Sequence, residues 1–174
     1  MIRIDITKRK KNFKNLKVEN GDFISLSIDQ ASTKSGYSVM INGELEVYGL
    51  IKATGNSMDR LFMMTEILEY LIDKYHPDFI GLENVQYQSN PQTLILLSKL
   101  LGMLENLCYS KNIEYNVIAP KTWKSVCGIK GKKRKEQKEN TVNFVKEHYQ
   151  IEVIEDIADA ISINHYIKEV IWNQ

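Results

Sequence analysis

Ser27-Ile28-Asp29-Gln30-Ala31-Ser32 decides the fold of this chain, because it ends an apolar run that begins at Phe23. Small and polar residues follow as far as Gly36, and a second apolar run covers residues 37–41. The pattern predicts a central strand with Asp29 near its end, a tight turn and a second strand. A carboxylate on a mostly buried strand is costly unless it is paired or bound to a cation. An isolated aspartate at such a place most often caps the next turn, so its role depends on the rest of the chain.

The composition indicates one globular domain in a reducing compartment. A chain of 174 residues can bury one sizeable core, and its share of charged residues, 26%, is ordinary. Cys108 and Cys127 form no CxxC pair, which argues against a disulfide scaffold and against a zinc site. No apolar run could span a bilayer, and the polar, basic N-terminus has no signal-peptide core. We therefore expect a cytoplasmic protein without membrane contact.

Charge is unevenly distributed along the chain, although its net value is only +1. Basic residues crowd residues 3–17 and 121–138, and acidic residues crowd residues 152–159. Separate blocks of opposite sign favour a contact with a polyanion beside an acidic site. Either basic run taken alone fits an ordinary solvated surface equally well.

The N-terminal third predicts an antiparallel meander. Residues 1–21 form either a short edge strand or a basic arm, because three alternating isoleucines give way to lysines. Strands follow at 23–28, 37–41 and 45–51, and Asn42-Gly43 is a strong signal for a two-residue hairpin between the last two. Residues 22–174 are expected to form the main domain.

A helix and a second acidic strand come next. Apolar residues at three- and four-residue spacing predict a helix that starts at Asn56 or Ser57 and ends near His76-Pro77. The strand 78–83 follows this helix, so we expect it to run parallel to the first strand through a right-handed crossover. It delivers Glu83 at its C-terminal end. Since ligand sites in open α/β sheets lie off the carboxyl ends of strands, Asp29 and Glu83 are candidates for one cleft.

The predicted helix 92–110 has two apolar rows, so it requires burial on more than one side. A second subunit could cover one of these rows, and so could the C-terminal helix. The row assigned to a partner consists of Leu96, Leu100, Met103 and Leu107.

The remaining elements complete an α/β fold. A strand at 114–118 precedes a short helix that opens at Pro120, in which we expect Trp123 to pack and Lys124 to face outward. The lysine-rich stretch enters a further helix, and the last helix covers residues 156–172. The predicted architecture is a five-stranded mixed sheet, with three antiparallel strands and then two parallel ones, flanked by helices.

Four carboxylates share one end of this predicted sheet. Asp156 and Asp159 lie on one face of the last helix, one turn apart, and join Asp29 and Glu83. Like charges so close raise one another's pKa unless a cation binds, and ligation by oxygen alone favours Mg²⁺ or Mn²⁺ over Zn²⁺. Two such ions roughly 3.5–4 Å apart would clamp the attacking water and the leaving oxygen of a phosphodiester, with Asp29 as the bridging ligand. The nearby basic run would hold the phosphate backbone.

From about Asp22 to the C-terminus, the chain resembles the RuvC-type Holliday junction resolvases of the ribonuclease H-like superfamily. Ser27-Ile28-Asp29-Gln30-Ala31-Ser32 with Ser35-Gly36-Tyr37 is similar to the family's first acidic strand and turn. Gly81-Leu82-Glu83-Asn84-Val85 resembles the second acidic strand. Asp156-Ile157-Ala158-Asp159-Ala160 resembles the DxxDA motif that begins the last helix, which is the most specific of the three.

The resemblance implies a ribonuclease H-like nuclease domain over residues 22–174. It also implies a homodimer, joined through the helix 92–110, that nicks four-way DNA junctions with two Mg²⁺ ions per site. Asp29, Glu83, Asp156 and Asp159 would then be catalytic metal ligands. A lysine ahead of the penultimate helix assists catalysis in this family, and Lys135 is the best match. The residues expected to contact DNA are Asn84, Gln86, Tyr87, Lys130, Lys132, Lys133, Arg134, Lys135 and Lys138.

Two departures from the family pattern concern the substrate. The cellular enzymes usually carry Pro-Gly after the first aspartate, where this chain has Gln30-Ala31. Their aromatic wedge after the second acidic strand aligns with Gln86, beside Tyr87. The chain therefore looks more like a phage-encoded member that acts on branched DNA generally, in the cytoplasm of its host.

Two other functions compete with this hypothesis. A non-catalytic module that binds DNA junctions would tolerate the loss of any acidic residue, whereas this chain carries four carboxylates at family-like positions. An actin-like phosphotransferase shares an acidic strand followed by small residues, but that architecture duplicates the domain and needs a longer chain.

Overall fold

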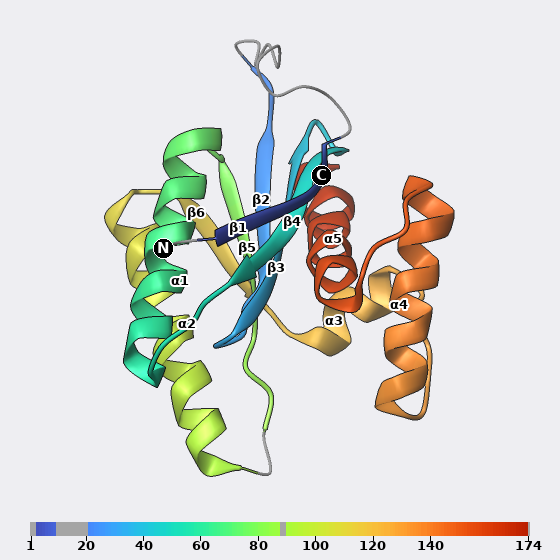
Figure 1. Cartoon of the computed structure of the whole chain (residues 1–174). Helices are drawn as coiled ribbons and strands as arrows, with labels where there is room; N and C mark the ends of the chain where they lie inside the picture. Colours follow the sequence, from blue (N-terminus) through green and yellow to red (C-terminus); the bar gives the residue numbers. More distant parts are fainter. Residues whose placement is uncertain (1–2, 10–20, 88–89, 174) are drawn as a thin grey trace.

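A computed structural model describes residues 3–9, 21–87 and 90–173, and it places one mixed sheet between two layers of helices (Figure 1). The strands are β1 (Arg3–Arg9), β2 (Ile24–Asp29), β3 (Lys34–Ile41), β4 (Glu44–Lys52), β5 (Phe79–Glu83) and β6 (Glu114–Ile118). The helices are α1 (Ser57–Tyr75), α2 (Pro91–Ser110), α3 (Pro120–Val126), α4 (Arg134–Tyr149) and α5 (Glu155–Ile167), which continues as the π-helix η2 (Lys168–Trp172).

The strand order confirms the predicted five-stranded core and adds a sixth strand at its edge. The order is β1-β4-β3-β2-β5-β6, in which β2, β3 and β4 form the antiparallel meander and β5 and β6 run parallel to β2. Strand β1 pairs antiparallel with β4. Residues 10–20 lie outside the described part of the chain, so the division into an N-terminal arm and a nuclease domain stays a prediction.

Local signals set the boundaries of the first elements. Asn42 and Gly43 both adopt positive φ, 50° and 74°, as a tight hairpin turn between β3 and β4 requires. The side chain of Asn56 accepts hydrogen bonds from the first turn of α1, and Asp59 completes a capping box. His76 ends α1 in the left-handed conformation immediately before Pro77. These predicted boundaries are confirmed.

The alternation along β2 sorts its side chains onto two different cores. Ile24, Leu26 and Ile28 pack in the cluster formed with α1 and α2. Ser25 and Ser27 point to the other face, where α5 lies. Since successive side chains of a strand point to opposite faces, Asp29 also belongs to the α5 face.

Buried hydrogen bonds hold α5 against β2 and β3. Ser27 Oγ donates to the backbone carbonyl of Ala160 at 2.6 Å. Asn164, which is fully buried, accepts from Ser25 Oγ at 2.6 Å and donates to the carbonyl of Ser38 at 3.1 Å. Each such bond contributes about 1 kcal/mol net, and an unmade one costs more, so the network fixes the register of α5 on the sheet.

The structure corrects the expected role of the second apolar row of α2. Leu100 and Leu107 are buried in the chain's own core, where α1 and the sheet cover them, so they cannot contact a partner subunit. Leu96 and Met103 are partly buried against the same core. The C-terminal helix lies on the opposite face of the sheet and does not cover α2 (Figure 1). Dimerisation stays a prediction.

None of the helices within the described ranges combines the length and the apolar character needed to cross a membrane.

Candidate active site

The pleat of the sheet brings Asp29 and Glu83 to one face at the carboxyl ends of β2 and β5. The two strands are paired in parallel as far as Ile28 and Leu82, so the two acidic residues follow the last matched pair. A β-carbon at Gly81 would meet the side chains of Ile163 and Ile167 in α5, so the odd-numbered residues of β5 point to the α5 side. Both carboxyl groups therefore face α5.

The first turns of α5 supply the other two carboxylates. Asp156 and Asp159 are both partly exposed, whereas Ile157, Ala158 and Ala160 are buried against the sheet. The negative charge of Asp159 raises the pKa of Glu83, and that of Asp29 raises the pKa of Asp159. The charge of Asp156 raises the pKa of Asp29. The four predicted acidic residues, which come from β2, β5 and α5, therefore lie close enough to influence one another's pKa values.

Burial disfavours the ionised forms of both Asp29 and Glu83. Burial raises the pKa of Asp29 well above its ordinary value, and the negative charge of Glu83 raises it further. Burial also raises the pKa of Glu83, against hydrogen bonds from Trp123 and Asp29 that lower it. Both carboxyl groups are therefore pushed toward the neutral form, Asp29 the more strongly of the two.

The second pair of carboxyl groups is also pushed toward the neutral form. Burial and the charge of Asp29 raise the pKa of Asp159 to about 7. Burial and the neighbouring Glu155 raise the pKa of Asp156. Asp159 Oδ1 is buried and has no hydrogen-bond partner among the described residues, which is costly unless a cation or a proton satisfies it.

The donor set fits a hard divalent cation. The four groups offer only carboxylate oxygens, the ligands that Mg²⁺ and Mn²⁺ prefer, and Asp159 presents a buried oxygen without a partner. Within the described ranges, no three Asp, Glu, His or Cys side chains converge into a ready-made metal site. A bound cation would favour the ionised forms of Asp29, Glu83 and Asp159, whose pKa values burial raises.

Lys138 of α4 acts on the carboxylates, whereas Lys135 is largely exposed. Lys135 is 88% exposed and pairs with Glu139 at 3.9 Å, away from the carboxylates. Lys138 follows one turn later on the inner side of α4, binds Glu155 at 2.5 Å and lowers the pKa values of Asp29, Asp156 and Asp159. Which of these lysines assists catalysis stays a prediction.

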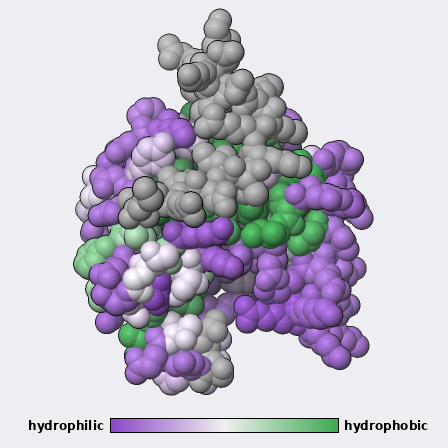
Figure 2. All heavy atoms as spheres, viewed as in Figure 1, coloured by the Kyte–Doolittle hydropathy of each residue, from purple (hydrophilic) through white to green (hydrophobic). Residues whose placement is uncertain are grey.

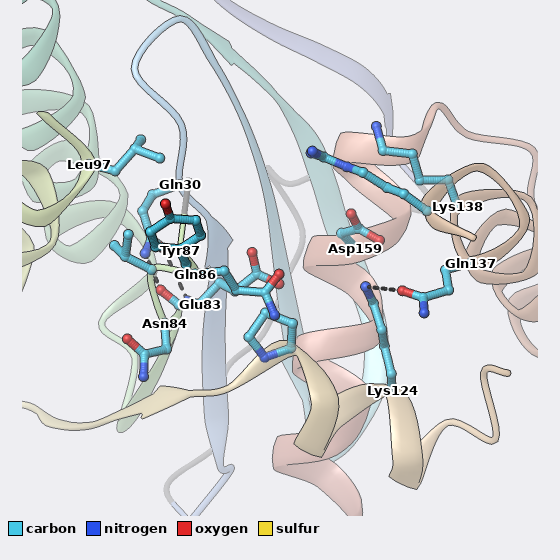
Figure 3. A pocket seen from close by; sticks show the side chains of 13 residues that line it. Gln30, Glu83, Asn84, Gln86, Tyr87, Leu97, Lys124, Gln137, Lys138 and Asp159 are labelled. Atoms are coloured by element: carbon cyan, nitrogen blue, oxygen red, sulfur yellow. Dashed lines mark hydrogen bonds between the residues drawn. The ribbon is translucent and has the colours of Figure 1, made fainter. Parts of the chain in front are cut away.

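Lys124 also points into the site, contrary to the expectation that it faces outward. Its Nζ donates to Gln137 Oε1 at 3.3 Å, and its charge lowers the pKa values of Glu83 and Asp159. Figure 3 shows Lys124 and Lys138 on one side of the pocket with Asp159, and Gln30, Glu83 and Tyr87 on the other.

The residues predicted to contact DNA fall into three groups. Asn84, Gln86, Tyr87, Arg134 and Lys138 line the pocket beside the carboxylates. Lys130 lines an adjoining hollow, which shares Gln86, Pro120, Lys124 and Gln137 with the first. Lys132, Lys133 and Lys135 are exposed and line neither. The surface over α4 is hydrophilic throughout this view (Figure 2).

Sequence reasoning did not assign Gln30, Trp123, Lys124 or Gln137 to the site. Gln30 bonds the backbone of Glu83, and the indole N–H of Trp123 donates to Glu83 Oε1 at 2.9 Å. A signal existed for Gln30 alone, because it directly follows the first acidic residue and departs from the family pattern.

Comparison with known sequences identifies one family. The model of the family described as crossover junction endodeoxyribonuclease RuvC matches residues 25–165. The RuvC of Prosthecochloris aestuarii is 30% identical over 151 residues, which cover 80% of this chain and 78% of that protein. The RuvC of Finegoldia magna is 26% identical over 144 residues, covering 79% and 88% of the two chains.

Solved structures show the same fold at low sequence identity. T. thermophilus RuvC in complex with a Holliday junction substrate superposes with a TM-score of 0.70 and 12% identity, covering 85% of this chain and 96% of that one. The yeast mitochondrial Holliday junction resolvase Ydc2 superposes with a TM-score of 0.53 and 16% identity, covering 86% and 81%. Both likenesses bear out the predicted ribonuclease H-like α/β architecture.

Proposed function

The chain belongs to the RuvC family of crossover junction endodeoxyribonucleases, and on that premise we propose that it nicks four-way DNA junctions by metal-dependent phosphodiester hydrolysis. The observation that carries this proposal is the convergence of Asp29, Glu83, Asp156 and Asp159 beside two lysines. Acidic oxygens and ammonium groups in one hollow are the complementary parts that hydrolysis of an anionic ester needs.

The four carboxylates would hold two Mg²⁺ ions, and Mn²⁺ would substitute for them. Bound divalent ions supply an activated water and neutralise charge on the phosphate. Asp29 interacts electrostatically with Glu83, Asp156 and Asp159, so it is the proposed shared ligand. Lys138 replaces Lys135 as the proposed assisting lysine, because Lys138 faces the carboxylates and Lys135 faces solvent.

The proposed DNA path follows the basic rim of the pocket. Lys124, Arg134 and Lys138 line the hollow beside the acidic residues, and Lys130 extends the positive surface into the adjoining one. These side chains would bind backbone phosphates without reading sequence. Tyr87 is 86% exposed at the end of β5's loop, where it is placed to stack on an unpaired base at a branch point.

A homodimer is the proposed assembly, since two symmetric nicks in a four-way junction need two active sites. Leu96 and Met103 of α2 keep partial exposure, and Ile95 is 48% exposed on the same helix. These residues replace the buried Leu100 and Leu107 as the proposed contact.

The decisive experiment is cleavage of a labelled immobile four-way junction, in Mg²⁺, Mn²⁺ or EDTA, alongside a linear duplex and a flap. Paired nicks in the junction alone would support a dedicated resolvase. Cutting of flaps as well would support a general nuclease for branched DNA. Binding without cutting in either metal would overturn the proposal in favour of a non-catalytic junction-binding module.

A further inference from the structure

The side-chain amide of Gln30 makes two hydrogen bonds with the backbone of one residue, Glu83. Gln30 Oε1 accepts from the backbone N–H of Glu83 at 3.1 Å, and Gln30 Nε2 donates to the carbonyl oxygen of Glu83. The two bonds close a ring between a side-chain amide and the main chain. Gln30 is only 9% exposed, so solvent does not readily substitute for these bonds.

The position of Gln30 explains what the ring does. The ladder between β2 and β5 ends at Ile28 and Leu82, whereas Asp29 at the end of β2 pairs only with Gly36 of β3. The main chain of Glu83 would therefore lack partners on the β2 side, and the amide of Gln30 supplies both. On the β6 side, Glu83 pairs with Ile118. The N–H and carbonyl of Glu83 are thus both bound on the β2 side, and on the β6 side the neighbouring N–H of Asn84 donates to the carbonyl of Ile118 at 2.9 Å.

The carboxylate of the same residue has its own anchor. Trp123 is fully buried in α3, and its indole N–H donates to Glu83 Oε1 at 2.9 Å. A buried indole ring has one packed orientation, so its N–H points in a fixed direction. The bond engages one of the two carboxylate oxygens of Glu83.

We propose that Gln30 and Trp123 are positioning residues that fix Glu83 for metal binding, Gln30 through its backbone and Trp123 through its carboxylate. The inference rests on the proposed function, in which Glu83 is a metal ligand. Groups that orient a ligand commonly contribute about 10- to 100-fold to metal affinity or activity. Neither residue touches the reacting atoms in this scheme.

Two nearly isosteric variants test the proposal. Trp123→Phe removes the indole N–H and keeps an aromatic ring, and Gln30→Met keeps the side-chain length and loses both amide bonds. Trp172→Phe and Gln92→Met are matched controls, because Trp172 stacks on Phe23 far from the site and Gln92 is exposed. The readouts are Mn²⁺ affinity by calorimetry without DNA, the Mg²⁺ concentration for half-maximal junction cutting, and junction affinity in EDTA.

We expect both test variants to weaken Mn²⁺ binding by about 10-fold or more and to raise the half-maximal Mg²⁺ concentration in parallel. Junction affinity in EDTA and all control values should match the wild type. Unchanged Mn²⁺ affinity in a folded Gln30→Met or Trp123→Phe protein would overturn the inference, even if its melting temperature falls. A wild-type protein that binds Mn²⁺ but does not cut would refute the proposed function while leaving this test intact.

Discussion

The backbone of Gly36 in β3 lies against the backbone carbonyl of Asp156 at the start of α5, so closely that a β-carbon at position 36 would lie 1.8 Å from that oxygen. Gly36 is also the cross-strand partner of Asp29. One glycine therefore lets the helix that carries Asp156 and Asp159 approach the strand that carries Asp29. The small residue after the first acidic strand is a requirement of the site's geometry.

Gly36→Ala should displace the first turn of α5 and separate the carboxylates. Because the clash is with backbone atoms, relaxation is costly, and we expect a loss of about 3 kcal/mol in unfolding free energy together with loss of cutting. Gly102→Ala is the control, since Gly102 is exposed in α2 and has open space around it. That change should stabilise the protein by about 0.5–1 kcal/mol. Urea unfolding measures the free energy of unfolding of both variants. Equal values for Gly36→Ala and Gly102→Ala would contradict the account.

Asn164→Ala should weaken the docking of α5 on the sheet. The change leaves Ser25 and Ser38 with unmade hydrogen bonds in a fully buried environment, at a cost of about 1–3 kcal/mol for each unsatisfied group. Asn106→Ala removes an amide from an exposed position of α2 and should cost less than about 0.5 kcal/mol. A variant Asn164→Ala as stable as Asn106→Ala in urea would show that the network does not hold the helix.

Metal-free protein should lose stability as the pH rises from about 4 to about 7. The pKa of Asp159 is raised to about 7 from 3.8, so the folded state favours its protonated form. The stability gained is complete below the unfolded pKa, falls as the pH rises between the two values and is lost above the folded one, a total on the order of 4 kcal/mol. Urea unfolding in EDTA across this pH range measures the slope of unfolding free energy against pH, and Asp159→Asn should make that slope smaller. Identical slopes for variant and wild type would refute the assignment.

Lys138→Ala should slow junction cutting by about 100-fold at saturating Mg²⁺, because it removes the positive charge that faces the carboxylates. Lys135→Ala should change the rate by less than about threefold, since its exposed pair with Glu139 contributes little. Single-turnover kinetics with pre-bound junction separates these effects from DNA affinity. A larger loss for Lys135→Ala would restore the lysine that the family resemblance favours.

Much of the fold could be predicted because its signals are local. Hairpin, cap and proline signals fixed the boundaries around Asn42-Gly43, Asn56 and His76-Pro77, and the two acidic strand ends followed from the order of the elements. The polar residues Ser25, Ser27 and Asp29 alternate along β2 and therefore point to one face of the sheet, the face on which the site lies. This signal is easily overlooked because the run is mostly apolar.

The errors concern contacts between distant elements. Lys124 was expected to face outward, but the packing of α3 turns it toward Gln137 and the pocket. The choice of Lys135 from the basic run rested on register alone and stays a prediction. Leu100 was assigned to a partner because the apolar surface of α2 exceeds what a sheet alone covers, and α1 supplies the missing contact. Side-chain bonds such as those of Gln30 and Trp123 to Glu83 span 53 and 40 residues, beyond any local pattern.

The most direct test of the central claim compares Asp29→Asn with the wild type on a labelled four-way junction in Mg²⁺. Asp73→Asn is the control, because that carboxylate is exposed on α1 and pairs only with Lys111 among its described contacts. The account predicts that Asp29→Asn binds the junction with wild-type affinity and cuts it at least about a thousandfold more slowly, while Asp73→Asn cuts normally. Cutting by pure Asp29→Asn at a rate near that of the wild type would contradict it.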